Sequence, residues 1–496
     1  MSTIEKKWRK HPNIFEINTW PWLNGLSKKY NRKIHLGNIP DELISQDIEL
    51  FDAVWLMGVW ERSPRGKRLA FEHPDLLRAF KDTLDDFKEE DVVGSPYSVF
   101  YYHVASDLGG KEGLKKFQRK LNERNIALIL DYVPNHVALD HIWTLEKSDM
   151  FIKGTEEDLK NNPDGYFKVN GNIYAHGKDP YFKPWTDTIQ INAFSSKARE
   201  KAKTILSTIA NFCDGVRCDM AMLMTNQVFK KTWGQKVGDP LETEFWVEVI
   251  NSVRNEYSEF KFIAEVYWDM EWELQQQGFD YCYDKILYDR LIHKDAQSVL
   301  SHLKAEWDYQ RKLVRFIENH DEERAMKSLN KKKSKAAALL IYTLPGASLT
   351  YEGQLKGFKK KVPVQLGRRP IEQSDEELRN FYQNLLSTLN SNRFDNKKWS
   401  LCQISPISES NFTNSNLISY QWWKDMEWLL FVINYSDVQS QGHVRIKNIT
   451  LNNHKWNFND LLKNRTYSYE GSNLNQHGLY IDLDPWDYHF FDLSKD

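Results

Sequence analysis

The sequence lacks any apolar run long enough to span a membrane. A membrane-spanning helix takes about 20 consecutive apolar residues, and no stretch of the 496 residues approaches that length. Residues 1–11 are charged and polar, without the apolar core that marks a secretory signal. We therefore expect a protein with no membrane partner that resides in the cytoplasm.

Cysteine and net charge are also scarce. The chain has four cysteines, none of them in a CxxC pair, and a net charge of −2. A zinc site is therefore not expected, and without a basic surplus nothing points to nucleic acid as a partner. Cys213 and Cys218 bracket an apolar segment and are typical of buried thiols in a reducing compartment. The sequence leaves the oligomeric state open.

Aromatic residues, in contrast, are abundant. They make up 14% of the chain and include 18 tryptophans. One interpretation is a large core with aromatic filler. The other is contact with carbohydrate, because sugar rings present flat C–H faces that lie well on indole and phenol rings. Composition alone favours neither interpretation.

Short apolar segments alternate with segments of helical period from about residue 14 to residue 389. Apolar runs without in-and-out alternation favour parallel strands that are covered on both faces. Repeated strand–helix alternation of this length predicts a (β/α)8 TIM barrel, in the α/β class. The expected strands include residues 53–57, 126–132, 215–219, 262–265, 279–284, 313–317 and 348–351.

Two regions break this rhythm. Residues 137–188 are rich in Gly, Asn, Pro and aromatic residues and predict a small domain inserted after the third strand. From about Arg393 onward, short alternating runs separated by turn residues predict a C-terminal antiparallel β-sandwich. The expected domains are a barrel of residues 1–136 and 189–395, the insertion, and a sandwich of residues 396–496.

Polar residues gather where the predicted strands end. In a barrel of this kind, the carboxyl ends of the strands face the active site. A single Asp at such a position more often caps a helix or forms a turn. Four strands that each end in polar or ionisable groups favour a functional site. These residues are Asp131, Asn135, His136, Arg217, Asp219, Glu265, Asn319, His320 and Asp321.

Arg217, Asp219 and Glu265 suggest a pair of acids with different tasks. Arg217 and Asp219 are two apart on a strand and therefore lie on the same face, where the guanidinium keeps the carboxylate ionised. Glu265 follows three apolar residues, and this apolar approach favours the neutral acid. Two carboxyl groups whose environments differ in this way form the pair that glycoside hydrolysis requires.

Four segments, in order, resemble those of the α-amylase family of retaining glycoside hydrolases. Each segment alone is weak, but four in order at these spacings are a strong indication. The likeness extends to GSPY at residues 94–97, to WTDT at residues 185–188 and to the C-terminal region, and so covers nearly the whole chain. The four segments are DYVPNH at residues 131–136, DGVRCD at 214–219, AEVY at 264–267 and FIENHD at 316–321.

The resemblance implies three catalytic carboxylates. Asp219 matches the nucleophile that forms the covalent glycosyl–enzyme, and Glu265 matches the residue that protonates the leaving oxygen and later activates water. Asp321 matches the carboxylate that binds sugar hydroxyls and steadies the distorted ring. The chemistry needs no cofactor.

The resemblance also implies substrate-binding residues. Arg217 matches the arginine that orients the nucleophile, and Tyr97 matches the aromatic platform beneath the reacting sugar. His136 and His320 match histidines that hydrogen-bond that sugar. Asp131 matches a structural aspartate of the barrel.

Met222 and Leu223 depart from the family pattern, and Asn135 leaves open whether the protein binds a structural metal ion. Where many relatives carry Lys and His shortly after the nucleophile, this chain has Met222 and Leu223, which puts an apolar surface at the acceptor sugar. Either this region is repacked or the acceptor preference is altered. Asn135 matches a common ligand of a structural Ca²⁺, with Asp179 and the carbonyl of Leu223 as further candidates, or it simply bonds to backbone.

The leading hypothesis is a retaining hydrolase of α-glucosidic bonds, with an α-glucan or maltooligosaccharide as substrate. An α-glucosyl transferase or an exo-α-glucosidase of the same family shares the chemistry. A third hypothesis is a sugar-binding homologue that has lost activity, although retention of Asp219, Glu265 and Asp321 argues against it. A metal-dependent hydrolase would need paired histidine ligands such as HxH, and no such pair ends a strand.

Overall fold

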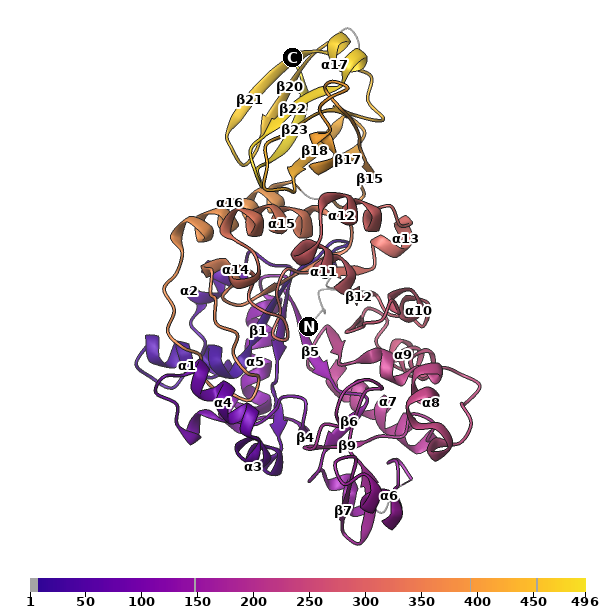
Figure 1. Ribbon diagram of the computed structural model, residues 1–496. Coiled ribbons are helices and arrows are strands. Elements are labelled where there is room, and N and C mark those ends of the chain that lie inside the picture. Colours follow the sequence, from indigo (N-terminus) through magenta and orange to yellow (C-terminus); the bar gives the residue numbers. More distant parts are fainter. Residues whose placement is uncertain (1–7, 147–148, 393, 452–453) are drawn as a thin grey trace. The chain divides into compact units, whose positions relative to one another are not determined.

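Eight parallel strands close into a barrel in the computed structural model, which describes residues 8–146, 149–392, 394–451 and 454–496 (Figure 1). Around the barrel the strands follow the order β1-β14-β13-β12-β11-β10-β5-β2. The predicted TIM barrel is thereby confirmed. The strands are β1 (Asn13–Asn18), β2 (Ala53–Met57), β5 (Ala127–Tyr132), β10 (Gly215–Cys218), β11 (Lys261–Ala264), β12 (Tyr281–Tyr283), β13 (Leu313–Arg315) and β14 (Ala347–Tyr351).

The barrel strands are apolar because both of their faces are covered. Every residue of β2 and of β5 is buried, as expected for parallel strands enclosed by helices. In α5 (Gly110–Asn122), Leu114, Phe117 and Leu121 recur at helical spacing and form a buried stripe. The helices include α1 (Thr19–Lys29), α5 (Gly110–Asn122), α7 (Ser196–Ala210), α9 (Phe245–Glu256), α11 (Lys285–His293), α15 (Lys331–Thr343) and α16 (Glu376–Ser391).

By its contacts the chain divides into two compact units. The first comprises mainly Ile14–Tyr283 and Lys360–Ile371, and the second comprises Arg9–Asn13, Asp284–Lys359 and Glu372–Asp496. This division differs from the domain boundaries expected from the sequence, which stay a prediction. The sequence break at Arg393 and the first seven residues of the polar N-terminal segment lie outside the described residues.

The segment inserted after β5 has a small core of its own. Within it, β6 (His136–Ala138) pairs antiparallel with β9 (Thr188–Gln190), and β7 (Tyr166–Val169) forms a hairpin with β8 (Asn172–Ala175). Asn170 and Gly171 turn this hairpin with φ of 50° and 76°, the left-handed conformation that a tight two-residue turn requires. Figure 1 shows β7 beside α6 (Glu156–Asn161), below β6 and β9. The buried apolar cluster of this region also includes one residue of α7, Ala198, and its members are Val137, Met150, Phe151, Tyr174, Ile189, Ile191 and Ala198.

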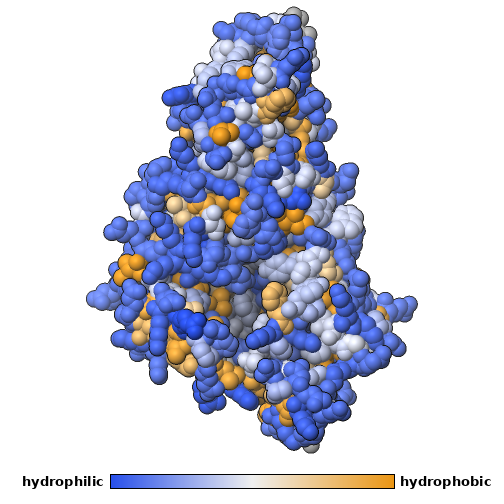
Figure 2. Space-filling model, in the orientation of Figure 1, coloured by the Kyte–Doolittle hydropathy of each residue, from blue (hydrophilic) through white to orange (hydrophobic). Residues whose placement is uncertain are grey.

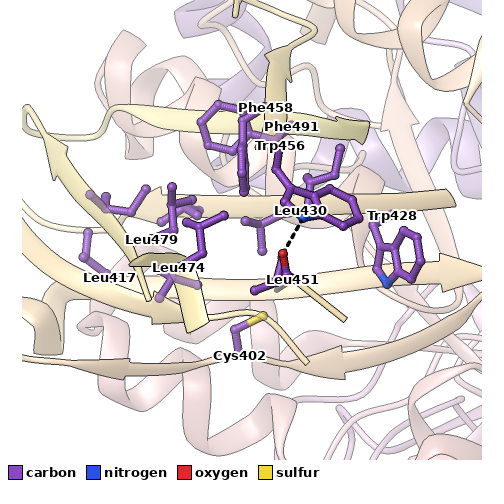
Figure 3. Packing of buried hydrophobic residues seen from close by; sticks show 14 of the residues in the cluster. Cys402, Leu417, Trp428, Leu430, Leu451, Trp456, Phe458, Leu474, Leu479 and Phe491 are labelled. Carbon is purple, nitrogen blue, oxygen red and sulfur yellow. Dashed lines mark hydrogen bonds between the residues drawn. The ribbon is translucent and has the colours of Figure 1, made fainter. Parts of the chain in front are cut away.

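The C-terminal region is an antiparallel sandwich. Its two sheets bury one shared cluster of apolar side chains, in which the Trp456 indole N–H donates to the Leu451 carbonyl at 3.1 Å (Figure 3). The larger sheet runs β15 (Lys398–Leu401), β17 (Leu417–Lys424), β18 (Glu427–Asn434), β23 (Tyr488–Lys495), β20 (Lys455–Asp460) and β21 (Arg465–Glu470). The smaller sheet runs β16 (Gln403–Ser405), β19 (Ser440–Arg445) and β22 (Leu479–Leu483).

The surface carries no broad apolar band on the face shown in Figure 2, where hydrophobic residues occur in small scattered groups among hydrophilic ones. Every helix in the described part of the chain is too short or too polar to cross a membrane.

Candidate active site

The ends of two adjacent strands place Asp219 and Glu265 together in the first unit. Asp219 directly follows β10 and Glu265 directly follows β11, and the backbone N–H of Glu265 donates to the carbonyl of Cys218 at 3.0 Å. Both residues are almost fully buried, with exposed fractions of 5% and 2%. The parallel pairing of β10 with β11 therefore brings the two acids to one edge of the sheet.

Arg217 bridges these two acids. Its Nη1 lies 2.8 Å from Oδ1 of Asp219, and its Nη2 lies 2.8 Å from Oε2 of Glu265. The guanidinium carbon is 5.2 Å from the ring centre of Tyr97. Burial by itself lowers the pKa of Arg217, but the charge of Glu265, followed by its other neighbours, outweighs burial and raises that pKa overall. The side chain is therefore a permanent cation between two carboxyl groups.

Glu265 has further hydrogen-bond donors around it. The backbone N–H of Met220 donates to Oε2 at 2.6 Å, and the hydroxyl of Tyr267 donates to Oε1 at 2.9 Å. Met220 reaches this position with a left-handed φ of 43°. Besides the apolar residues that precede it in the sequence, Glu265 therefore has polar partners on both oxygens, Tyr267 two residues further on and Met220 from the preceding strand end.

Asp131 is fixed by three groups of the barrel. Its carboxylate accepts from the Trp55 indole N–H at 3.2 Å and from the Gly58 backbone N–H at 3.0 Å. Its backbone carbonyl accepts from the Trp60 indole at 2.8 Å. The nearest nitrogen of Arg217 is 3.8 Å away. These contacts suit the structural part that the resemblance implied for this residue.

His136 lies on β6, buried with 3% exposed. Its ring is 5.0 Å from that of Trp185, and Nδ1 faces Nδ2 of Asn135 at 3.3 Å. Burial lowers the pKa of His136 to about 4, against an opposing hydrogen bond with the backbone of Tyr97. The imidazole is therefore neutral near pH 7 and able to share a hydrogen bond with a sugar hydroxyl.

Asn135 does not fit the cation site that the sequence left open. Nε2 of Gln190 donates to Oδ1 of Asn135 at 2.8 Å and also to the carbonyls of Asn135 and Ile191, at 2.9 and 3.0 Å. Oδ1 of Asp179 accepts the N–H groups of Tyr181 and Phe182. An amide donor thus lies where a Ca²⁺ bound by Asn135 would lie. No group of three His, Cys, Asp or Glu side chains suited to a metal occurs among the described residues.

The third predicted carboxylate belongs to the second unit. Asp321 has a side chain 43% exposed, and its Oδ2 lies 2.9 Å from Nε2 of the buried His320. Oδ1 of Asn319 accepts the backbone N–H groups of Asp321 and Glu322 and so shapes the turn after β13. The meeting of Asp321 with Asp219 and Glu265 stays a prediction.

Arg324 is a buried structural residue. Its Nη1 lies 3.1 Å from the carboxylate of Glu318, and Nη2 donates to the carbonyl of Glu352 at 2.9 Å. From the sequence alone, Arg324, three residues after Asp321, could equally have paired with a carboxylate or lain on the surface.

The apolar residues after the nucleophile do not form an exposed surface. Met222 and Leu223 are 0% and 2% exposed, in a short 3-10 helix of Ala221–Met224. The predicted apolar acceptor surface is therefore wrong, and this region is repacked into the core. Sequence reasoning also missed Tyr267 as a partner of Glu265, although a position two residues further along the same motif was a usable signal.

The closed barrel of eight parallel strands defines a TIM-type (β/α)8 protein, with the paired acids Asp219 and Glu265 at the carboxyl ends of two adjacent strands. The family model described as "Alpha amylase, catalytic domain" matches residues 97–414. The chain therefore belongs to the α-amylase family.

Similar proteins agree with this membership. Alpha-amylase 3 of Dictyoglomus thermophilum is 25% identical over 299 residues, covering 56% of this chain and 56% of its own length. Alpha-amylase MalA of Haloarcula japonica is 26% identical over 298 residues, covering 58% and 39%. The chain thus spans about half or less of the length of these relatives. The crystal structure of a noncanonic maltogenic alpha-amylase from Thermotoga neapolitana has the same fold, with a TM-score of 0.67, 18% identity and coverage of 97% and 98%.

Proposed function

We propose that the chain is a retaining glycoside hydrolase that cleaves α-glucosidic bonds in starch- or glycogen-type glucans or in maltooligosaccharides. The arrangement that carries this proposal is the pair Asp219 and Glu265 held by one guanidinium, that of Arg217. A retaining mechanism needs its two carboxyl groups about 5–5.5 Å apart, and a shared arginine is compatible with so short a separation.

In the first step Asp219 attacks the anomeric carbon. Arg217 holds Oδ1 of Asp219, and the carboxylate stabilises the positive charge that develops on the sugar. The glycosidic bond breaks as Glu265 donates its proton to the departing oxygen. The result is a sugar esterified to Asp219, a free leaving sugar and an ionised Glu265.

In the second step water replaces Asp219. The oxygen of the water attacks the anomeric carbon while Glu265 takes a proton from the water, and the ester bond to Asp219 breaks. Tyr267 and the Met220 N–H hold the Glu265 carboxyl, which fixes the place where a proton is given and taken. We assign sugar contact to Tyr97, His136, His320 and Asp321, in line with the family resemblance.

Two further outcomes share this chemistry. A glucosyl transferase would give products longer than the substrate, and an exo-α-glucosidase would release only glucose from the first minutes. A sugar-binding homologue without activity would bind the same ligands and turn none of them over.

The test is incubation with a panel of α-glucans and disaccharides, with products followed by chromatography and anomeric configuration by NMR. We expect α-anomers as first products. Asp219→Asn should abolish hydrolysis and leave the thermal unfolding midpoint near that of the wild type. The exposed Asp437→Asn serves as the matched control. Inversion at the anomeric carbon, or near-normal activity of Asp219→Asn, would reject the proposal.

A further inference from the structure

Arg62, the last residue of β3 (Trp60–Arg62), is a cation that has no acidic partner in the described part of the chain. Its Nη1 donates to the backbone carbonyl of Gly94 at 2.6 Å and to that of Val364 at 3.0 Å. The guanidinium carbon lies 5.4 Å from the ring centre of Trp20. Nε and Nη2 are buried and have no hydrogen-bond partner among the described residues. The contacts of this guanidinium are therefore two backbone carbonyls and an aromatic ring.

A guanidinium in such surroundings is costly to keep. A charged group taken out of water loses its hydration, and a carboxylate partner usually compensates for that loss. Burial lowers the pKa of Arg62 to about 9. An apolar side chain of similar length would meet a packing role alone. The cost is offset here by charge-assisted hydrogen bonds to the two carbonyls and by the ring of Trp20, which indicates that Arg62 serves to hold those carbonyls.

Gly58 makes room for the guanidinium of Arg62. Gly58 has a φ of 75°, and a Cβ at this position would lie 2.6 Å from Nη2 of Arg62 and 2.9 Å from Cβ of Pro96. A residue with a side chain would therefore be strained and would collide with its neighbours. The N–H of Gly58 also donates to the carboxylate of Asp131 at 3.0 Å. The place of Arg62 is thus fixed by the same glycine that contacts the structural aspartate of the site.

One of the two segments that the guanidinium holds is a strap, which we define as residues 363–368. The strap runs beside residues that are far from it in the sequence. The N–H of Val93 donates to the carbonyl of Gln365 at 2.8 Å, and the N–H of Gly367 donates to the carbonyl of Asp91 at 2.6 Å. All of these residues belong to the first unit. The strap therefore packs along the segment that leads into the other held residue, Gly94.

That other segment continues directly to Tyr97. Gly94, whose carbonyl Arg62 holds, lies three residues before Tyr97. On the other side of Tyr97, the carbonyl of Ser98 accepts the N–H of Ser63 at 3.1 Å. The loop that carries Tyr97 is therefore fixed on one side by Arg62 and on the other side by the residue that follows Arg62.

We infer that Arg62 is a positioning residue, which joins the strap to the loop of Tyr97 and so sets the place of the Tyr97 ring beneath the reacting sugar. This inference rests on the proposed function. The Tyr97 ring centre lies 5.2 Å from the guanidinium carbon of Arg217, so a displaced ring would shift relative to both acids that Arg217 bridges. Arg62 acts through Tyr97 and leaves the chemistry to those acids.

A double-mutant cycle of Arg62→Met with Tyr97→Ala in the full-length protein tests this role. The readout is kcat/KM on the α-glucan that the wild type cleaves best, and thermal melts check folding. We expect Arg62→Met alone to lower kcat/KM about tenfold and to cause almost no further loss in the Tyr97→Ala background, because residues in one network are coupled.

Arg62→Lys is the milder variant and carries the test if Arg62→Met does not fold. It keeps the positive charge, but a point charge on a flexible stem holds two carbonyls less firmly than a planar guanidinium does. We expect a loss of about threefold in kcat/KM, which should likewise disappear in the Tyr97→Ala background.

The matched control is Arg199→Met. Arg199 is another buried arginine of the first unit that holds two backbone carbonyls, those of Ala193 at 3.0 Å and Thr243 at 2.7 Å. We expect its replacement to lower the melting temperature and to change kcat/KM by the same factor in the wild-type and Tyr97→Ala backgrounds, since distant sites are usually additive. An arginine with a merely structural role would behave in this way.

The possible results separate this inference from the proposed function. If both Arg62 variants multiply with Tyr97→Ala as Arg199→Met does, or leave kcat/KM unchanged, the positioning role is wrong while the proposed function stands. A Tyr97→Ala variant with wild-type kcat/KM would remove the platform role of Tyr97 and this inference with it. A wild-type protein that cleaves no member of the α-glucan panel overturns both.

Discussion

Among single residues, Arg217 is a buried cation that contacts two carboxyl groups at once. It is 1% exposed and reaches a different acid with each terminal nitrogen. A planar guanidinium can hold two carboxyl groups in a fixed relation, whereas the ammonium of lysine is a compact point charge on a flexible stem. The geometry of the site therefore depends on the shape of this cation as well as on its charge.

Replacing Arg217 by Lys tests that dependence. We expect kcat on α-glucans to fall about 10²- to 10³-fold, the usual loss when one preorganised electrostatic contact is removed. Initial rates measure the effect, and thermal melts check folding. Arg254→Lys, at a partly exposed ion pair with Asp280, is the matched control. An Arg217→Lys rate within about threefold of the wild type would contradict the bridging role.

The neutral state of His136 should make stability depend on pH. An unfolded histidine takes up a proton near pH 6.5, whereas burial lowers the pKa of His136 in the folded protein to about 4. Between these values the unfolded state binds more protons, so stability falls as pH drops from about 6.5 to 4, by up to about 3 kcal/mol.

The measurement is the difference in melting temperature between pH 7 and pH 5. His136→Gln should show a smaller difference than the wild type. His73→Gln changes an exposed histidine and should keep the wild-type difference. Equal differences in all three proteins would contradict the assigned environment of His136.

At the scale of elements, the pairing of β6 with β9 brings the amide of Gln190 to the oxygens of Asn135, where the sequence left a cation site open. The side-chain amide nitrogen of Gln190 on β9 contacts two oxygens of Asn135, just before β6, and the carbonyl of Ile191, just after β9. We therefore expect a chelator to leave the melting temperature within about 2 °C. Gln190→Ala should lower it, because the oxygens of Asn135 lose their donor. A large fall of the wild-type melting temperature on chelation would show that a metal is bound.

Elements with regular local patterns could be predicted from the sequence. The apolar run of β5 and the stripe of α5 signal a covered strand and an amphipathic helix without reference to the rest of the chain. β20 and β21 have little local strand signal, since asparagines at 452, 453, 457, 459 and 464 are typical of loops. Their pairing with each other and with β23 overrides that local preference.

In the candidate site, too, contacts between residues that are neighbours in the sequence could be predicted, whereas contacts between residues far apart in the sequence could not. The closeness of Arg217 and Asp219 follows from strand alternation, because Asp219 directly follows the strand that carries Arg217 and is two residues from it. The hydrogen-bond donors to Glu265 come from the turn after β10 and from the turn after β11, and the burial of Met222 depends on packing. The contact with Met220 and the burial of Met222 could not be predicted from the adjacent sequence, whereas Tyr267, two residues after Glu265, could have been.

On the scale of the whole molecule, the C-terminal strands are tied to residues 284–359 within the second unit. The Trp422 indole donates to the carbonyl of Thr343 at 2.7 Å, and the Tyr435 hydroxyl donates to the carbonyl of Leu291 at 2.7 Å. Both aromatic side chains are buried. The sandwich is therefore part of the environment of α11 and α15.

Truncation after residue 395 measures that dependence. We expect the shortened chain to be insoluble or to melt at least about 10 °C lower, because buried aromatic contacts and hydrogen bonds to α11 and α15 are lost. Soluble yield and thermal melts report the result. A truncated protein that melts within about 3 °C of the full chain would establish residues 396–496 as an independent domain.

The shared guanidinium also has a consequence for timing in the proposed mechanism. When a sugar becomes esterified to Asp219, that carboxylate loses its charge, and of the two acids that Arg217 bridges only Glu265 can still carry a charge. This happens just when Glu265 has given up its proton and must next accept one from an incoming hydroxyl group. Arg217 thus stabilises the negative charge first on Asp219 and then on Glu265 without moving. The covalent intermediate therefore already contains the ionised Glu265, held by Arg217, that the second step requires.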